Sequence, residues 1–298
     1  MRALIVGEGQ LGGAVRDQLP GSAGIGGTPW GDPAQARHHV AAAVAGFMAV
    51  PGPRCVLWCA GAGIVGSSEI ALANERSILR SVLETVDRHG GIDRLFLASS
   101  AGGVYGGNLG LCNEATPPRP LSDYGRAKLL QEAMVTDWAR ATGTPTLIGR
   151  ISNLYGPRQN LLKPQGFISH LLAAMQRQHS FVYTVPASTL RDFVYADDVG
   201  ARIASWAASP TGRNSIDVKI LAADQSLSLA HVAALASRVT RRPARVLFTF
   251  NPLSVQPAAV RLRSSVIVPG LPEHGNRPLE HGLWQTWQNL LRADRARR

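Results

Sequence analysis

Short apolar runs alternate with helix-patterned segments along the first half of the chain, and this alternation constrains the fold more than any other feature. Apolar residues follow one another directly in these runs, which is typical of parallel strands buried on both faces. The runs are ALIV (3–6), CVLWCA (55–60), LFLAS (95–99) and PTLIGRI (145–151). Helical spacing of apolar residues appears at 77–89 and again at 123–142, where Gly143 follows as a stop. The alternation predicts an α/β fold with a doubly wound parallel sheet.

Composition and charge exclude several classes of protein. The longest apolar run, residues 40–50, is too short to span a bilayer, for which about 18 residues are needed. Three cysteines make a disulfide framework improbable and favour a reducing cytoplasm. The net charge of +11 invites a nucleic-acid partner, but the arginines are scattered and cluster only in the tail RADRARR. We therefore expect an anionic small-molecule substrate, no nucleic acid and no membrane.

The first apolar run leads directly into a glycine turn. Gly7, Gly9 and Gly12 fit the pattern G-x-G-x-x-G, with Gln10 and Leu11 between the last two glycines. Glycine lets the backbone approach a pyrophosphate, and the following helix offers its amides to the phosphates. This turn, placed between a strand and a helix, predicts a dinucleotide-binding Rossmann domain.

The identity of the dinucleotide depends on a carboxylate that the sequence does not place clearly. An acidic residue that ends the second strand usually binds the ribose hydroxyls of NAD. In AGIGGTPWGD the expected place lies near Thr28, and Asp32 is the nearest acid. Arg37 and the positive net charge favour an additional phosphate. We therefore expect NADP(H) or NAD(H), with NADP(H) bound at least as tightly.

The segment YGRAK places Tyr124 and Lys128 four residues apart. On a helix the phenol and the ammonium then project from one face, so that the cation can favour the ionised form of the hydroxyl. The strand at 95–99 ends on Ser99 and Ser100 only 24 residues upstream. Together with the glycine turn, these groups indicate a catalytic site.

These motifs resemble those of the extended short-chain dehydrogenase/reductases, the NAD-dependent epimerase/dehydratase family. The resemblance covers nearly the whole chain and consists of several segments in the same order. They are SSAGGVYG (99–106), YGRAK (124–128), RISNLYGPRQ (150–159), LRDFVYADDV (190–199) and RPLEHGLWQTW (277–287).

The resemblance implies a role for the serines at the strand end. In this family a hydroxyl at that place hydrogen-bonds the substrate while the tyrosine transfers a proton and the nicotinamide a hydride. Ser100 is the expected donor and Ser99 the alternative, whereas an alignment without a gap would place Ala101 there. The catalytic residues implied are thus Ser100, Tyr124 and Lys128.

The resemblance also implies binding residues. Ala60, Gly61, Asn74 and Ile151 are expected beside the cofactor, and Ser99 and Asn153 beside the substrate. Arg191 could bind a diphosphate or pair with a neighbouring aspartate, and Arg263 could add a second phosphate contact. His38 and His39 have no partners at ligand spacing, so no metal site is predicted.

Two departures from the family pattern matter. The glycine turn is one residue shorter than the usual Gly-x-x-Gly-x-x-Gly. Gly102 and Gly103 stand where the family's dehydratases and decarboxylases carry acidic residues after the catalytic hydroxyl. Because glycine can act neither as an acid nor as a base, we expect no elimination chemistry.

The sequence thus predicts two domains and one class of reaction. Residues 1–152 would form the dinucleotide-binding domain, completed by segments near 181–205, and residues 153–298 mostly a smaller, loop-rich substrate lobe. The expected protein is a cytoplasmic NAD(P)-dependent oxidoreductase that acts on a nucleotide-activated sugar as a 4-epimerase or ketoreductase. A non-catalytic dinucleotide sensor or scaffold is the alternative. The sugar, the nucleotide and the oligomeric state stay open, with a homodimer as one possibility.

Overall fold

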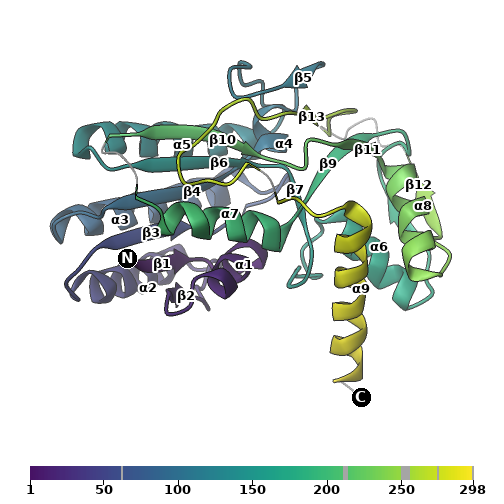
Figure 1. Ribbon diagram of the computed structural model, residues 1–298, viewed down its shortest axis with the longest axis horizontal. Coiled ribbons are helices and arrows are strands. Elements are labelled where there is room, and N and C mark those ends of the chain that lie inside the picture. Colours follow the sequence, from purple (N-terminus) through teal and green to yellow (C-terminus); the bar gives the residue numbers. More distant parts are fainter. Residues whose placement is uncertain (62, 211–213, 250–255, 274, 297–298) are drawn as a thin grey trace.

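A six-stranded parallel sheet forms the centre of the computed structural model, which describes residues 1–61, 63–210, 214–249, 256–273 and 275–296 (Figure 1). All neighbouring strands of this sheet run parallel. Their spatial order is β10 (Ile216–Leu221), β6 (Thr146–Ile151), β4 (Arg94–Ser100), β3 (Arg54–Trp58), β1 (Arg2–Val6) and β2 (Ala23–Ile25). The doubly wound parallel sheet that the sequence predicts is confirmed.

Helices cover both faces of the sheet, because successive side chains of each strand point to opposite sides. Leu4 and Val6 of β1 pack in one core with three helices, whereas Ala3 and Ile5 pack in another core with two. The first layer holds α2 (Pro33–Met48), α3 (Glu69–Arg88) and α5 (Asp123–Thr142), and the second holds α1 (Gln10–Gln18) and α7 (Ala196–Ala208). The sheet is therefore buried on both faces, as its apolar runs indicate.

The C-terminal half adds a smaller body beside the carboxyl end of the sheet (Figure 1). Its helices α6 (Phe167–Gln176), α8 (Leu229–Thr240) and α9 (Leu279–Arg295) share one apolar core. Three small sheets accompany them, one of β7 (Asn153–Tyr155), β9 (Leu190–Tyr195) and β11 (Ser226–Ser228), one of β8 (Phe181–Tyr183) and β12 (Val246–Phe248), and one of β5 (Leu111–Cys112) and β13 (Arg261–Leu262). A short helix α4 (Ala101–Val104) follows β4.

The chain returns to the main sheet later than the sequence suggests. The segment expected to complete the first domain, 181–205, contributes most of α7, but the sixth strand β10 lies further on, at Ile216–Leu221. The division into two domains at residue 152 stays a prediction. The carboxyl ends of the strands face the C-terminal body across one cleft.

Candidate active site

One cleft of about 900 Å³ lies at the carboxyl ends of the parallel strands, between the sheet and the C-terminal body. This is the edge at which open α/β sheets bind ligands. The cleft brings together most of the residues that the sequence singles out as a site. They are Gly7, Gly9, Gln10, Leu11, Ala60, Gly61, Ser99, Ser100, Tyr124, Ile151, Asn153 and Arg191.

The glycine turn at one end of the cleft fits a diphosphate. Gly7 has φ +95°, which favours glycine, and a Cβ at Gly12 would overlap the Gly7 carbonyl oxygen. A Cβ at Gly9 would meet no atom within 4 Å, so the backbone there is open to the cleft. Helix α1 starts at Gln10 without a side-chain cap or an acidic residue in its first turn. Its first amides are therefore available for phosphate oxygens.

The two serines at the end of β4 differ in their partners. The Ser99 hydroxyl donates to Oε1 of Glu132 at 2.5 Å, and Glu132 is itself held by a buried ion pair with Arg150. The Ser100 hydroxyl accepts a bond from the Gly103 amide at 3.1 Å. A hydroxyl that accepts one bond still has its proton to donate. The geometry therefore favours Ser100 over Ser99 as a donor to a ligand in the cleft.

Tyr124 and Lys128 lie on the same side of α5, which begins after its cap Ser122. The Lys128 ammonium lies 5.8 Å from the centre of the Tyr124 ring. Tyr124 lines the cleft, whereas Lys128 is buried behind it, with 4% of its surface exposed. A Cβ at Gly103 would come within 3.1 Å of Tyr124 Cε1, so a larger side chain there would crowd the phenol.

A buried glutamate neutralises Lys128. Lys128 Nζ donates to Oε1 of Glu75 at 2.9 Å and to Oε1 of Gln131 at 3.0 Å. Gln131 Nε2 and the Gly63 amide also donate to the Glu75 carboxylate, each at 2.9 Å. Burial is the largest influence on the pKa of Lys128 and acts to lower it, but the charge and hydrogen bond of Glu75, together with Tyr124 and Glu132, raise this pKa above its usual range overall. Burial acts to raise the pKa of Glu75, yet Lys128 and the hydrogen bonds lower it overall.

Arg191 lies at the other end of the cleft without an acidic partner among the described residues. Arg191 is buried, with only 8% of its surface exposed. Nη1 donates to the carbonyl of Leu190 at 2.9 Å, and Nη2 to Oε1 of Gln256 at 3.3 Å. Burial lowers the pKa of Arg191 below its usual range. A guanidinium in this setting has donors and charge available for an anion.

The aspartates near Arg191 in the sequence have other partners. Asp192 accepts bonds from the backbone amides of Ala223 and Gln225, each at 2.9 Å. Asp197 pairs with Arg158, and Asp198 pairs with Arg277. The salt bridge considered for Arg191 is therefore not formed with any of these three. Asn153 donates to the Asp192 carbonyl at 2.8 Å and lines the cleft beside Arg191.

Five of the expected site residues do not line the cleft. Gly12 and Lys128 support it from beneath, through the glycine turn and the Tyr124 helix. Asn74 lies half-buried on α3 next to Glu75, and Arg263 is exposed after β13, where its amide donates to the Cys112 carbonyl at 2.9 Å. The Thr28 hydroxyl is buried without a hydrogen-bond partner among the described residues. Asp32 caps α2 by accepting the amides of Ala34 and Gln35.

Sequence reasoning missed several polar residues in the cleft or buried behind it. Lys163 donates from Nζ to the Gly61 carbonyl at 3.1 Å and so spans the cleft from the C-terminal body to the sheet. Gln256 holds Arg191, and Glu75 holds Lys128. Glu75 had a signal, because it stands within the helical apolar stripe of Leu72, Leu79, Val82 and Val86. A carboxylate in such a stripe needs a buried partner. Lys163 and Gln256 lie in segments without a distinguishing pattern.

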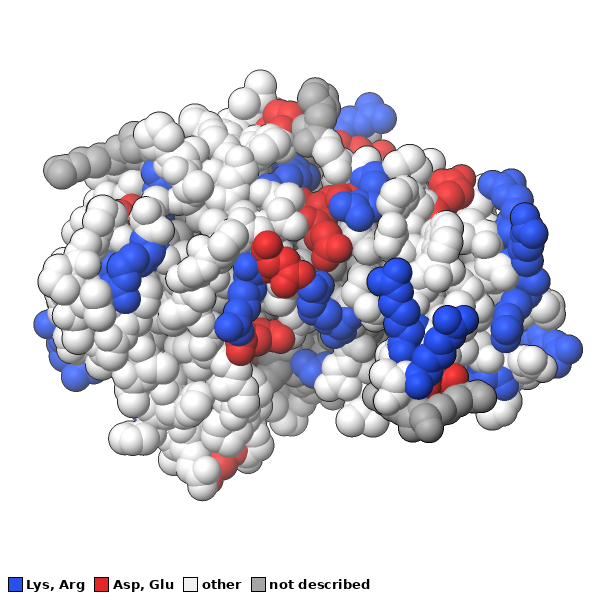
Figure 2. Space-filling view, turned by 60° about the horizontal axis from the view of Figure 1, so that its bottom comes forward, with Lys and Arg blue, Asp and Glu red and all other residues white. Residues whose placement is uncertain are grey.

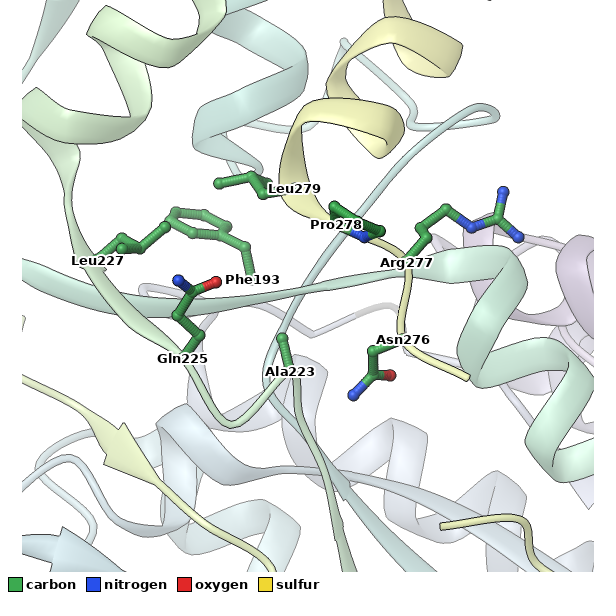
Figure 3. Close-up of a pocket in the computed structure, with 8 residues that line it drawn as sticks. All are labelled: Phe193, Ala223, Gln225, Leu227, Asn276, Arg277, Pro278 and Leu279. Carbon is green, nitrogen blue, oxygen red and sulfur yellow. The ribbon is translucent and has the colours of Figure 1, made fainter. Parts of the chain in front are cut away.

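A second cavity, of about 180 Å³, lies between β9, β11 and the start of α9 (Figure 3). The Arg277 guanidinium points away from it in Figure 3 and pairs with Asp198. Asn276 donates from its amide to the Ala222 carbonyl at 2.9 Å. Arg277 and Asn276 are therefore bonded elsewhere, and the larger cleft, which gathers most of the expected site residues, is the better candidate site.

The surface charge, the helices and the possible metal ligands concern three other expectations, namely those about nucleic acid, membranes and metal ions. On the face shown in Figure 2, basic side chains are spread over the surface and are interspersed with acidic ones in the middle of the view. No helix within the described ranges is both long and apolar enough to cross a membrane. Among the same residues, no three His, Cys, Asp or Glu side chains gather as metal ligands would, and His38 and His39 are exposed.

Known proteins resemble the chain in sequence and in fold. It is 31% identical over 176 residues to dTDP-L-rhamnose 4-epimerase of Burkholderia thailandensis, covering 58% of this chain and 48% of that protein. It is 36% identical over 120 residues to a putative UDP-glucose 4-epimerase of Methanocaldococcus jannaschii, covering 40% and 39%. The chain thus matches less than half the length of these relatives.

Solved structures share the fold over almost the whole chain. A UDP-glucuronic acid 4-epimerase from Bacillus cereus superimposes with a TM-score of 0.80 and 20% identity, over 98% of this chain and 100% of that one. The family model described as "NAD dependent epimerase/dehydratase family" matches residues 34–218, more than half of the chain. The match starts after the glycine turn and contains Tyr124, Lys128 and Arg191. The chain belongs to the NAD dependent epimerase/dehydratase family.

Proposed function

We propose that the protein is an NAD(P)-dependent oxidoreductase that inverts C4 of a nucleotide-activated hexose. The observation that carries the proposal is Arg191, a buried cation without a carboxylate partner among the described residues, in the same cleft as Ser100 and Tyr124. A nucleotide sugar has a diphosphate to bind the cation and a hydroxyl to meet the other two groups. The relatives named above as 4-epimerases support this reading.

Each side chain has a task in this reaction. A nicotinamide bound at the glycine turn would supply the acceptor, and then the donor, of the hydride at C4 of the sugar. Tyr124 accepts the proton of the C4 hydroxyl as that hydroxyl becomes a carbonyl, and later returns it. Ser100 donates a hydrogen bond to the same oxygen in both states. Lys128 supplies a fixed positive charge behind the phenol, and Arg191 with Asn153 holds the phosphate end.

Epimerisation makes one further demand, which separates it from reduction. The hydride leaves one face of C4 and returns to the other, so the keto sugar must turn between the two steps. No net oxidant is consumed, and one equivalent of bound cofactor serves many turnovers. A ketoreductase would use one equivalent of reduced cofactor for each molecule of product, although its first contacts would be the same.

The test is to incubate the protein with UDP- and dTDP-hexoses and a catalytic amount of NAD⁺ or NADP⁺. Proton NMR should show the C4 epimer forming without net change in cofactor absorbance at 340 nm. A parallel sample of Tyr124→Phe, which keeps the ring and loses the hydroxyl, should form none. Stoichiometric oxidation of NADPH with a 4-keto sugar would instead support the ketoreductase, and binding of dinucleotide without any turnover would support the sensor.

The cellular location and the oligomeric state of the protein remain predictions. Cys55, Cys59 and Cys112 are free thiols, and burial raises the pKa of each, which suits a reducing cytoplasm. A homodimer stays open, and light scattering of the purified protein would decide it.

A further inference from the structure

A carboxylate from the glycine turn lies at the end of β2. The Gly7 amide donates to the Ile25 carbonyl at 3.2 Å, so that residue 8 starts beside the last residue of β2. The Glu8 side chain then runs along this strand end, and its carboxylate pairs with Arg16 of α1. About a quarter of the Glu8 side chain, 26%, is exposed.

Two glycines make room for this carboxylate, Gly24 of β2 and Gly26 directly after it. A Cβ at Gly24 would overlap Oε1 of Glu8, and a Cβ at Gly26 would overlap Oε2. Neither glycine has a positive φ, so space rather than backbone conformation accounts for them. The Glu8 carboxylate therefore fills the space that side chains at positions 24 and 26 would occupy. It takes the position that an acidic side chain at the end of β2 would have.

The acid that the sequence of β2 lacks is thereby supplied from elsewhere. A carboxylate at the end of the second strand accepts hydrogen bonds from the ribose hydroxyls of NAD and repels a 2′-phosphate. Asp32, the nearest acid after β2, is engaged in capping α2. We propose that Glu8 selects NAD over NADP in this protein. The proposal rests on the proposed dinucleotide-dependent function, and it reverses the preference for NADP(H) that the sequence of β2 alone suggests.

Arg16 strengthens this selection while it stays paired. An arginine near the ribose can accommodate a 2′-phosphate, because its fork of donors matches phosphate oxygens. Here the Glu8 carboxylate already holds the guanidinium. Removing the Glu8 charge would release Arg16, so a single substitution would both abolish the repulsion and provide a cation.

The experiment is calorimetric titration of the apoprotein with NAD⁺ and with NADP⁺. We expect the wild type to bind NAD⁺ at least tenfold more tightly. Glu8→Gln, which keeps the shape and removes the charge, should lower the ratio of the two dissociation constants at least tenfold. Asp32→Asn is the matched control, since it neutralises the other nearby acid, keeps a side chain that caps α2 and should leave the ratio unchanged.

Two more variants test the position of the Glu8 carboxylate and the role of Arg16. Gly26→Ala should lower the same ratio with the fold retained, because the group in its way is the end of a flexible side chain. Glu8→Gln combined with Arg16→Ala should lose the NADP⁺ affinity that Glu8→Gln alone gains. An unchanged ratio in Glu8→Gln, or a change of the ratio in Asp32→Asn as large as in Glu8→Gln, would overturn the assignment and leave the function intact. Failure of the wild type to bind either dinucleotide would overturn both.

Discussion

The buried pair of Glu75 and Lys128 allows a sharp prediction about Glu75→Gln. The carboxylate accepts from three donors, namely Lys128 Nζ, Gln131 Nε2 and the Gly63 amide, each at 2.9 Å. A glutamine can present its oxygen to only part of this set, and its own NH₂ group would then face a donor. Lys128 would keep a buried charge with neutral acceptors only.

Breaking a buried ion pair by removing one partner costs about 3–5 kcal/mol. At about 2 °C per kcal/mol for a chain of this size, the melting midpoint should fall by about 6–10 °C. Glu84→Gln is the control, because Glu84 lies on the same helix α3 and is exposed, and it should change stability by at most about 0.5 kcal/mol.

The pH dependence of the difference identifies its cause. The pKa of Glu75 is lowered in the folded state, so its contribution is present above the unfolded value of about 4.3 and is lost as pH falls through the lowered pKa. The pKa of Lys128 is raised, so its contribution is present below about 10.4 and is lost as pH rises through the raised pKa. In Glu75→Gln, Lys128 can lose its proton on burial, which relieves the variant at alkaline pH.

The gap between wild type and Glu75→Gln should thus be widest near neutral pH and close toward both extremes. Thermal or urea unfolding from about pH 2 to pH 10 measures it, since the Glu75 contribution is lost only below its unfolded pKa. A gap below about 1 kcal/mol at pH 7, or one that is independent of pH over this range, would show that Lys128 does not depend on Glu75 for its charge, and the reasoning would fail.

The remaining predictions concern the cleft. Tyr124→Phe should abolish turnover and leave dinucleotide binding, measured by calorimetry, within about twofold, because only the proton carrier is removed; unchanged turnover contradicts the role. Ser100→Ala should lower kcat by about 10²-fold relative to the wild type, as the loss of other oxyanion donors does, and Ser99→Ala should lower it less. The reverse order of the two variants would assign the donor to Ser99. Arg191→Ala should raise KM for the nucleotide sugar by 10-fold or more, and an equal KM would place the diphosphate elsewhere. Because Gly102 and Gly103 supply no acid or base, mass spectrometry of the products should show no loss of water or carbon dioxide from the sugar.

The sequence predicts the inner part of the sheet well and its edges poorly. The runs 3–6, 95–99 and 145–151 agree with β1, β4 and β6 to within a residue or two, because both faces of these strands are buried and apolar. β2 has only three residues, two of them exposed, and offers little pattern. β10 contains Asp217 and the buried Lys219, whose ammonium pairs with Glu273 more than fifty residues later. Such a partner is invisible to local periodicity.

The site divides in the same way. Ser100 and Tyr124 belong to local motifs, so their presence and spacing could be read directly. The groups that set their surroundings come from distant segments, as Glu75 does for Lys128 and Glu132 does for Ser99. Glu8 stands within the glycine turn of the sequence, but its carboxylate comes next to Gly24 and Gly26 only when β1 and β2 pair.

The position of β2 at the edge of the sheet has a consequence for how such a protein can change. The unit β1–α1–β2 carries the glycine turn and Glu8 within residues 2–25, whereas the groups proposed to meet the sugar nucleotide, from Ser99 to Arg191, lie on later segments. The glycine turn shares the cleft with these groups, but the two sets share no stretch of chain. Exchanging this first unit between relatives, by selection or by design, can therefore change the proposed preference between NAD and NADP while the residues proposed to bind the sugar nucleotide stay the same.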